Sequence, residues 1–147
     1  MGSFSGKEQD MLRRTALLNE ISDANYQTFV EISDKASYNT GDVLLKEGEK
    51  SDYLFIILSG EVELYKNNEE DGSQHLIGKL SSGQSIGEMR VIRTIPCTLT
   101  VKAAKPTVVS YTLISKLSSK KYRQCYESIL DSIVLILNER LFNSNQN

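Results

Sequence analysis

The residue types that most often catalyse reactions or bind metals are sparse in this sequence. It contains one histidine, His75, and two cysteines, Cys97 and Cys125, which stand apart without the spacing of metal ligands. A single histidine without a partner makes no case for acid–base catalysis, and it cannot complete a cupin-like metal site. We therefore expect no metal, no catalytic residue, no bound cofactor and no enzymatic activity.

Cys97 is the thiol whose surroundings allow two interpretations. A nearby positive charge such as Arg90, or a helix N-terminus, would lower its pKa and make it redox-sensitive. A buried strand cysteine that packs as a small hydrophobic residue is the other interpretation. His75 is expected at the sheet surface. A basic cluster near the final helix is expected to be a solvated face; it comprises Lys116, Lys120, Lys121 and Arg123.

Length and charge narrow the classes of protein further. The 147 residues suit one domain, and 17 basic against 19 acidic residues give a net charge of -2. This charge provides no global attraction for nucleic acid, and too few residues follow Leu113 for a helix-turn-helix domain. No apolar run approaches the roughly 18 residues that span a bilayer. We expect a cytoplasmic protein with no membrane span, and export by an unrecognised signal stays open.

Hydrophobic periodicity divides residues 1–147 into three parts of one domain. Residues 7–35 show helical spacing, with Ser22 as an N-cap that opens a second helix. Residues 37–114 consist of short apolar runs between glycine-containing turns, and polar residues 67–73 form a hairpin loop between two of them. Residues 115–142 return to helical spacing, with two adjoining apolar stripes. The order predicts a mainly β fold flanked by helices.

Two groups of motifs stand at characteristic distances in the β portion of the sequence. The first group comprises Gly41-Asp42, Glu47-Gly48, Asp52, the run Tyr53–Leu58 and Ser59-Gly60. The second comprises Gly83, Ile86-Gly87-Glu88-Met89, Pro96 and Thr100-Val101. Together they resemble the cyclic-nucleotide-binding domains of catabolite-activator proteins, protein kinase A regulatory subunits and nucleotide-gated channels, and the second group is similar to the family's phosphate-binding cassette. The resemblance covers roughly residues 18–137. It implies an antiparallel β-roll, a jelly-roll-like double-stranded β-helix, with N-terminal helices and a C-terminal helix.

The resemblance also implies a ligand site. In the family the cassette forms a short helix whose N-terminal amides face the cyclic phosphate, because free amides and the helix dipole favour an anion there. Ile86, Gly87, Glu88 and Met89 would lie at that start. Gly87 matches the point where the backbone approaches the ligand, and Glu88 matches the acid that accepts a hydrogen bond from the ribose 2′-hydroxyl. A solvated loop acid is the alternative for Glu88.

The cassette departs from the family pattern at Cys97, where the family carries an arginine that pairs with the phosphate. Losing this charge-assisted contact, at about 1.5 to 3 kcal/mol, would weaken binding roughly 10- to 100-fold. Arg90 or Arg93 is positioned in sequence to replace the charge; alternatively Arg90 blocks the pocket or is a surface residue. Thr98 is expected either to contact the phosphate or a guanine amino group, or to be a solvent-facing strand residue.

In the family, ligand binding pulls a C-terminal helix over the roll, and an apolar side chain on it covers the base. The resemblance nominates Tyr122, Tyr126 or Ile129 for this lid, although simple packing on the roll is the alternative. The second apolar stripe predicts a homodimer or a contact with a partner protein.

The sequence therefore predicts a sensor or adaptor module for cyclic AMP, cyclic GMP or a related small molecule, with weak or altered ligand preference. The competing hypothesis is a degenerate β-roll that binds a protein partner and no nucleotide.

Overall fold

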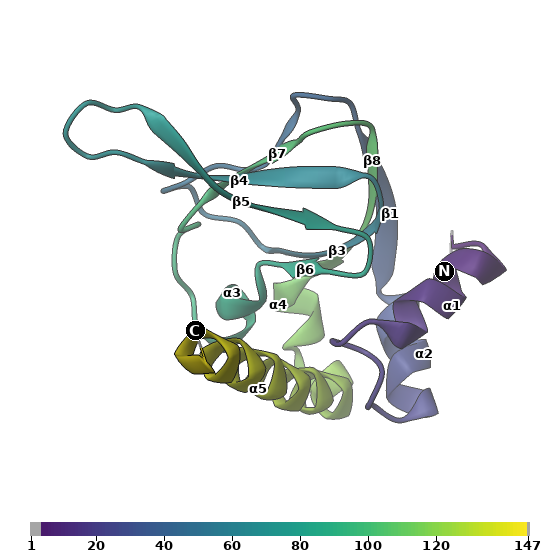
Figure 1. Ribbon diagram of the computed structural model, residues 1–147. Coiled ribbons are helices and arrows are strands. Elements are labelled where there is room, and N and C mark those ends of the chain that lie inside the picture. The colour runs from purple at the N-terminus through teal and green to yellow at the C-terminus, as the bar shows by residue number, and fades with distance from the viewer. Residues whose placement is uncertain (1–3, 147) are drawn as a thin grey trace.

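Two antiparallel four-stranded sheets stacked on each other form the centre of the computed structural model, which describes residues 4–146 and the side chains of residues 4–141 (Figure 1). One sheet has the order β1-β8-β3-β6 and the other β2-β7-β4-β5. Their strands are β1 (Ser33–Tyr38), β2 (Val43–Leu45), β3 (Tyr53–Ser59), β4 (Glu61–Asn67), β5 (Gln74–Ser81), β6 (Ser85–Ile86), β7 (Thr100–Ala103) and β8 (Thr107–Leu113).

Helices precede, interrupt and follow these strands. They are α1 (Gly6–Arg14), α2 (Asp23–Glu31), α3 (Glu88–Ile92), α4 (Ile114–Leu117) and α5 (Arg123–Gln146), with a 3-10 turn η1 (Lys120–Tyr122) before the last. The expected fold class, an antiparallel β-roll with N-terminal helices and a C-terminal helix, is confirmed. Among the helices of residues 4–146, none combines the length and apolar composition that crossing a bilayer requires.

Side-chain caps fix where the first two helices begin. Ser5 and Glu8 form a reciprocal capping box on α1, with the Ser5 amide donating to Glu8 Oε1 at 2.8 Å. Ser22 caps α2 as expected, because its Oγ accepts from the Asn25 amide at 3.1 Å. The helical spacing past Arg14 was misleading, since Leu17 and other apolar residues before α2 are buried from a turn rather than from a helix.

The first strand begins where the sequence predicted helix. The helix expected to continue to about residue 35 ends at Glu31, and Ser33–Tyr38 pairs with β8 instead. Ser33 marks the change: its hydroxyl lies 2.6 Å from the Phe29 carbonyl oxygen and 2.6 Å from Thr112 Oγ1. Pairing with a distant strand therefore overrides the local helical spacing.

Strand β3 is buried on both faces and separates two apolar cores. Leu54, Ile56 and Leu58 pack towards the helices, whereas Phe55 and Ile57 pack between the two sheets. This double burial explains the unbroken apolar run in the sequence. Helix α5 lies along the helical core, and its C-terminal end lies close to α3 (Figure 1). The fold thus brings the C-terminal part of α5 to the predicted phosphate cassette.

Candidate functional site

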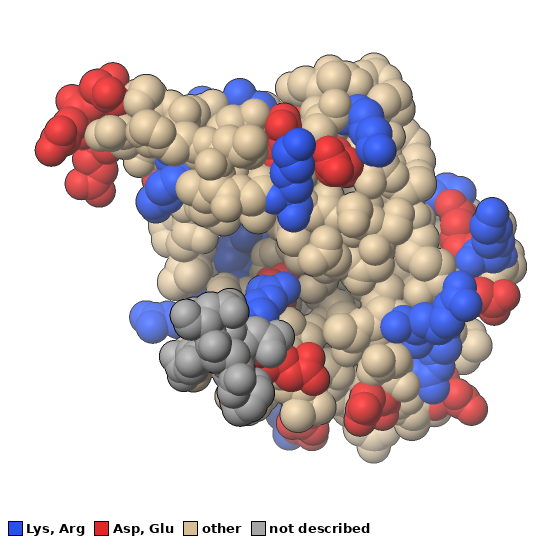
Figure 2. All heavy atoms as spheres, in the orientation of Figure 1, with Lys and Arg blue, Asp and Glu red and all other residues tan. Residues whose placement is uncertain are grey.

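A cavity of about 400 Å³ lies where β6, α3, residues 95–99 and the end of α5 meet. Its walls are largely apolar, and its polar side chains are those of Gln84, Ser85, Glu88, Arg90, Thr98 and Arg140. Figure 2 shows a hollow beneath the β4–β5 hairpin with basic side chains at its floor. A concave, mostly apolar surface with a small number of polar groups that point into it is typical of a small-molecule binding site.

The predicted cassette residues gather at this cavity. Ile86, Gly87, Glu88, Met89, Arg90, Cys97 and Thr98 all line it. Their proximity results from the chain turning at Gly87 into α3 and returning through residues 93–99 to β7. All seven candidate ligand-binding residues therefore line the same cavity.

Gly87 is the N-cap of α3 and adopts a left-handed conformation, with φ of +92°. A Cβ here would collide with the guanidinium of Arg90 and lie 3.0 Å from the Tyr53 carbonyl oxygen. Both the positive φ and the crowding favour glycine at this position.

The Glu88 carboxylate is buried and already has two partners. Its Oε2 accepts from Ser85 Oγ at 3.2 Å, and its Oε1 pairs with Arg140 Nη1 at 2.8 Å. The Glu88 side chain is 8% exposed and that of Arg140 is 51% exposed. Glu88 is therefore a fixed acceptor in the cavity wall, and the alternative of a solvated loop acid is wrong.

Arg140 is the site residue that sequence reasoning missed. It stands 52 residues after Glu88, on the last part of α5 that has described side chains. No local periodicity or motif links residues so far apart. An unassigned arginine at the end of the helix was the only available signal.

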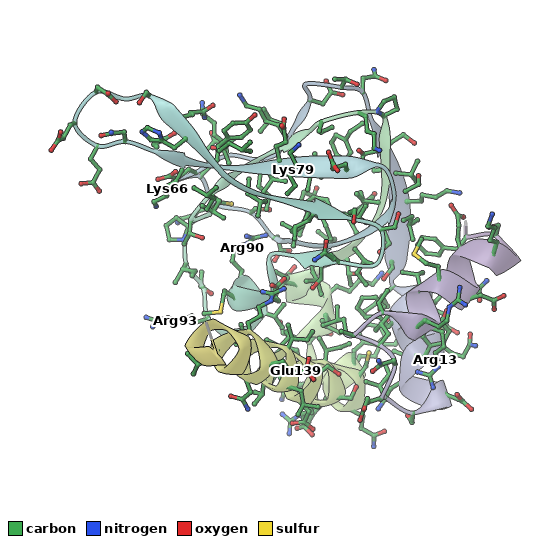
Figure 3. All side chains as sticks on the ribbon, in the orientation of Figure 1. Arg13, Lys66, Lys79, Arg90, Arg93 and Glu139 are labelled. Atoms are coloured by element: carbon green, nitrogen blue, oxygen red, sulfur yellow. The ribbon has the colours of Figure 1, made fainter. Side chains whose placement is uncertain are left out.

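Arg90 folds back over the start of α3 instead of extending into solvent. Its Nη2 donates to the Tyr53 carbonyl oxygen at 2.6 Å, and Figure 3 shows the side chain lying between the strands and α3. Its Nε is buried and has no hydrogen-bond partner among the described side chains and backbone. A buried donor without an acceptor is costly. An anionic ligand would reach this nitrogen only after the Arg90 side chain turned towards the cavity, and that turn would satisfy the donor.

Arg93, the other arginine considered as a replacement, lies elsewhere. It is exposed, and Figure 3 shows its side chain pointing outward from the molecule. In this structure Arg90, and not Arg93, contributes its charge to the cavity wall.

Cys97 packs as a small apolar residue at the base of the cavity. It is buried with Leu45, Ile86 and Val101 in the core between the sheets. Its backbone is fixed on both sides, because its amide donates to the Glu49 carbonyl oxygen at 2.9 Å and its own carbonyl accepts from the Gly48 amide at 2.8 Å. Thr98 is exposed at the rim of the cavity.

We expect both cysteines to resist thiol reagents at neutral pH, because both are buried. Burial raises the pKa of the Cys125 thiol to about 11. This folded-state pKa exceeds the ordinary value near 8.5, so any stability that Cys125 contributes is present below about pH 8.5 and is lost as the pH rises through 11. Absorbance-monitored labelling should be at least about tenfold slower for native than for unfolded protein. Rapid native labelling of Cys97 would instead support the redox interpretation.

The three residues nominated as a lid lie away from the cavity lining. The Tyr126 hydroxyl donates to the Val91 carbonyl oxygen at 3.0 Å, which braces α3 from behind. Ile129 is fully buried in the helical core, and Tyr122 packs against that core half-buried. In this arrangement Arg140, later on α5, is the helix residue that reaches the cavity.

Sequence and structure comparisons identify relatives of this arrangement. The chain is 28% identical over 99 residues to a cAMP-dependent protein kinase regulatory subunit from Mycosarcoma maydis, covering 67% of this chain and 18% of that protein. The chain spans between 9% and 21% of the lengths of the first four curated relatives.

Two solved structures of one Trypanosoma brucei protein resemble the fold. The first is the regulatory subunit of a cAMP-independent protein kinase A; it has a TM-score of 0.76 at 17% identity, and the match covers 94% of this chain and 50% of that one. A triple mutant of that subunit, bound to cAMP in its A site, has a TM-score of 0.76 at 16% identity, covering 96% and 52%.

The family model for the cyclic nucleotide-binding domain matches residues 35–118, which include most of β1, all of β2 to β8, the cavity cassette and α3. This match extends over more than half of the sequence, and the chain therefore belongs to the cyclic nucleotide-binding domain family.

Proposed function

We propose that the chain is a sensor or adaptor module, without enzymatic activity, that binds a cyclic nucleotide or a related small anion in the cavity beside α3. The observation that carries this proposal is the buried, unpartnered Nε of Arg90 next to Gly87 and Glu88. Arg90 then supplies the positive charge that the family places at the position of Cys97.

The relocated charge implies weak or altered ligand preference. An arginine that holds a phosphate with two parallel hydrogen bonds needs both donors free. Arg90 already donates through Nη2 to the Tyr53 carbonyl oxygen, so fewer of its donors face a ligand. Thr98 at the rim offers a hydroxyl to a phosphate or to a guanine amino group. We therefore include cyclic GMP as well as cyclic AMP among the candidate ligands.

The Trypanosoma brucei mutant offers a parallel for a cassette that lacks the family's arginine, as this one does at Cys97. Its three substitutions replace a glutamate by alanine, a threonine by arginine and a valine by alanine, with the first two seven positions apart and the last two adjacent. Arg90, Cys97 and Thr98 have the same spacing in this chain. The parallel supports Cys97→Arg as a variant that restores an anchoring charge.

Thermal unfolding with added nucleotides tests the proposal. A ligand at about 100 times its dissociation constant should stabilise the protein by roughly 2.7 kcal/mol. We expect cyclic AMP or cyclic GMP at millimolar concentration to raise Tm, and the corresponding acyclic 5′-monophosphates to raise it less. No change in Tm with any cyclic mononucleotide or dinucleotide would contradict the proposal.

A protein-interaction module without a nucleotide is the second candidate function. It is favoured by the occupation of Glu88 by Arg140 and by an exposed apolar face on α5 formed by Val134, Leu135 and Leu141. We propose a second copy of the chain as the partner and the cytoplasm as the location.

The dimer makes its own prediction. Val134 is 52% exposed, so we expect Val134→Glu to abolish self-association without unfolding the protein. Leu76→Glu is the matched control, because Leu76 is 50% exposed on β5, away from α5. Light scattering on a dilution series should show a dimer for the wild type and the control, and a monomer for Val134→Glu. A wild type that stays monomeric at millimolar concentration would exclude the dimer.

A further inference from the structure

A hydrogen bond from Lys66 holds the backbone beside Thr98, at the rim of the cavity. The Nζ atom of Lys66 donates to the Thr98 carbonyl oxygen at 3.2 Å. Among the described residues, this is the only hydrogen bond from a side chain to residues 94–99, the segment that returns from α3 to β7. Figure 3 shows Lys66 at the base of the β4–β5 hairpin. Lys66 itself lies outside the cavity lining, so a ligand in the cavity meets Thr98 and not Lys66.

Both peptide groups that flank the Cα atom of Thr98 are held by hydrogen bonds. A peptide group is planar, so a hydrogen bond to its oxygen restrains the orientation of the whole group. The Cys97 carbonyl oxygen, in the group before Thr98, accepts from the Gly48 amide at 2.8 Å. The Thr98 carbonyl oxygen, in the group after it, accepts from Lys66. Removing the second bond loosens the backbone at Thr98 and lets the direction of its Cα–Cβ bond vary.

Glu47 keeps the Lys66 ammonium in place for this bond. Its Oε2 lies 3.2 Å from Lys66 Nζ, while its Oε1 accepts from the Asn67 amide at 2.8 Å. The Glu47 amide donates to Thr100 Oγ1 at 3.0 Å, at the start of β7. The side chains of Glu47 and Lys66 are 18% and 53% exposed. Glu47 is thus anchored through its carboxylate and its backbone, and it restrains a flexible lysine side chain that would otherwise extend into solvent.

We propose that Lys66, held by Glu47, is a positioning residue that presents the Thr98 hydroxyl to a nucleotide in the cavity. The inference rests on the proposed function, because it assumes that a ligand contacts Thr98. The thiol of the neighbouring Cys97 packs in the apolar core between the sheets, so it does not hold this segment through a polar contact. The Lys66 bond therefore determines how firmly the rim offers its hydroxyl.

A positioning role and a direct effect of charge have different consequences for binding. If Lys66 acts through Thr98, removing Lys66 weakens only the contact that the Thr98 hydroxyl makes. The loss of affinity then disappears in a protein that lacks this hydroxyl. If the ammonium instead attracts the phosphate from a distance, the loss persists without the hydroxyl and is the same for cyclic AMP and cyclic GMP.

The ligand-free protein tests the hold on this segment independently of any nucleotide. We expect Lys66→Met to accelerate hydrogen exchange of the Gly48 and Cys97 amides, which bond across the segment, about two- to fivefold, the range for partly exposed ion pairs. Lys66→Arg keeps the charge and a donor and should restore most of the protection. Lys79→Met is the matched control and should leave both exchange rates unchanged, because Lys79 is 54% exposed and pairs with Glu61 on the same sheet. Unchanged exchange in Lys66→Met would overturn the proposal.

A double-mutant cycle with Thr98→Val tests the effect on the ligand. We expect Lys66→Met to weaken binding about two- to fivefold, and only for the nucleotide, cyclic AMP, cyclic GMP or both, that Thr98→Val also weakens. The double variant should bind that nucleotide no more weakly than Thr98→Val alone. Lys79→Met should bind both nucleotides as the wild type does. Calorimetric titration measures these affinities.

Additive losses in the double variant would contradict the positioning role, because Lys66 would then act independently of Thr98. An unchanged affinity of Thr98→Val for both nucleotides would contradict it as well. If no nucleotide binds to the wild type, the proposed function fails and the presentation of Thr98 to a ligand fails with it. Exchange of the Gly48 and Cys97 amides still decides whether Lys66 holds the segment.

Discussion

Arg90→Leu is expected to weaken cyclic nucleotide binding roughly 10- to 100-fold, and adding Cys97→Arg is expected to restore most of the loss. A charge-assisted hydrogen bond contributes about 1.5 to 3 kcal/mol, which corresponds to this range. Leucine retains much of the volume of the arginine stem and removes the buried Nε that has no described partner. Calorimetric titration of both variants with cyclic AMP and cyclic GMP measures the effect.

The sign of this effect separates the two roles that Arg90 can have inside the cavity. If Arg90 blocks the pocket, Arg90→Leu should bind nucleotide as tightly as the wild type or more tightly. Arg93→Leu provides the matched control, because Arg93 is an exposed arginine that points away from the cavity. It should change the affinity less than about threefold, as expected for a screened surface charge. An equal loss in both variants would mean that net charge, and not a contact from Arg90, attracts the ligand.

Gly60→Ala is expected to lower the free energy of unfolding by about 3 to 5 kcal/mol. Gly60 has φ of +97°, which an alanine adopts only with strain. An added Cβ would also lie 2.5 Å from the Pro106 carbonyl oxygen and 2.7 Å from Thr107 Cα, both of which are backbone atoms. The clash falls on Thr107. Its hydroxyl accepts a hydrogen bond from the Glu61 amide and so connects the start of β8 to the start of β4.

Gly41→Ala isolates the part of this loss that comes from φ alone. Gly41 has φ of +90°, but an added Cβ would meet no atom within 4 Å. Its expected cost is about 1 kcal/mol. Urea denaturation of both variants gives the difference. Equal losses in the two variants would show that the backbone near Thr107 moves to make room for the methyl group. The close approach of this backbone to Gly60 would then not contribute to the loss of stability.

These two glycines illustrate what the sequence could predict and what it could not. Both stand in turns between apolar runs, and the pattern predicted the turns and the β-roll correctly. Spacing alone does not show that Gly60 lies against Pro106 and Thr107 while Gly41 faces open space. Close approach between segments is a tertiary property.

The strand Ser33–Tyr38 escaped sequence reasoning for a related reason. Its sequence is largely polar, and its exposed and partly buried positions leave no apolar run. The strand forms because β8 provides a pairing edge more than seventy residues later, beginning with Ser33 opposite Thr112. Strand β3 was predictable because burial on both faces makes it continuously apolar.

The candidate site also contains some features that the sequence predicts and others that depend on tertiary contacts. Gly87, Glu88 and Cys97 lie within one short segment that the motif marked, and all three line one cavity. The direction of the Arg90 side chain depends on a carbonyl oxygen of β3, and the Arg140 contact depends on where α5 ends. Neither follows from residue order.

Nuclear magnetic resonance of the Arg90 Nε–H group tests the central claim most directly. This group is buried without a described partner, so a phosphate oxygen that reaches it should shift its resonance and slow its exchange with water. We predict such a shift on titration with cyclic AMP or cyclic GMP, saturating together with the amide shifts of Gly87 and Glu88. Amide shifts without a change at Arg90 Nε–H, or no shift in any of these groups, would contradict the relocation of the anchoring charge to Arg90.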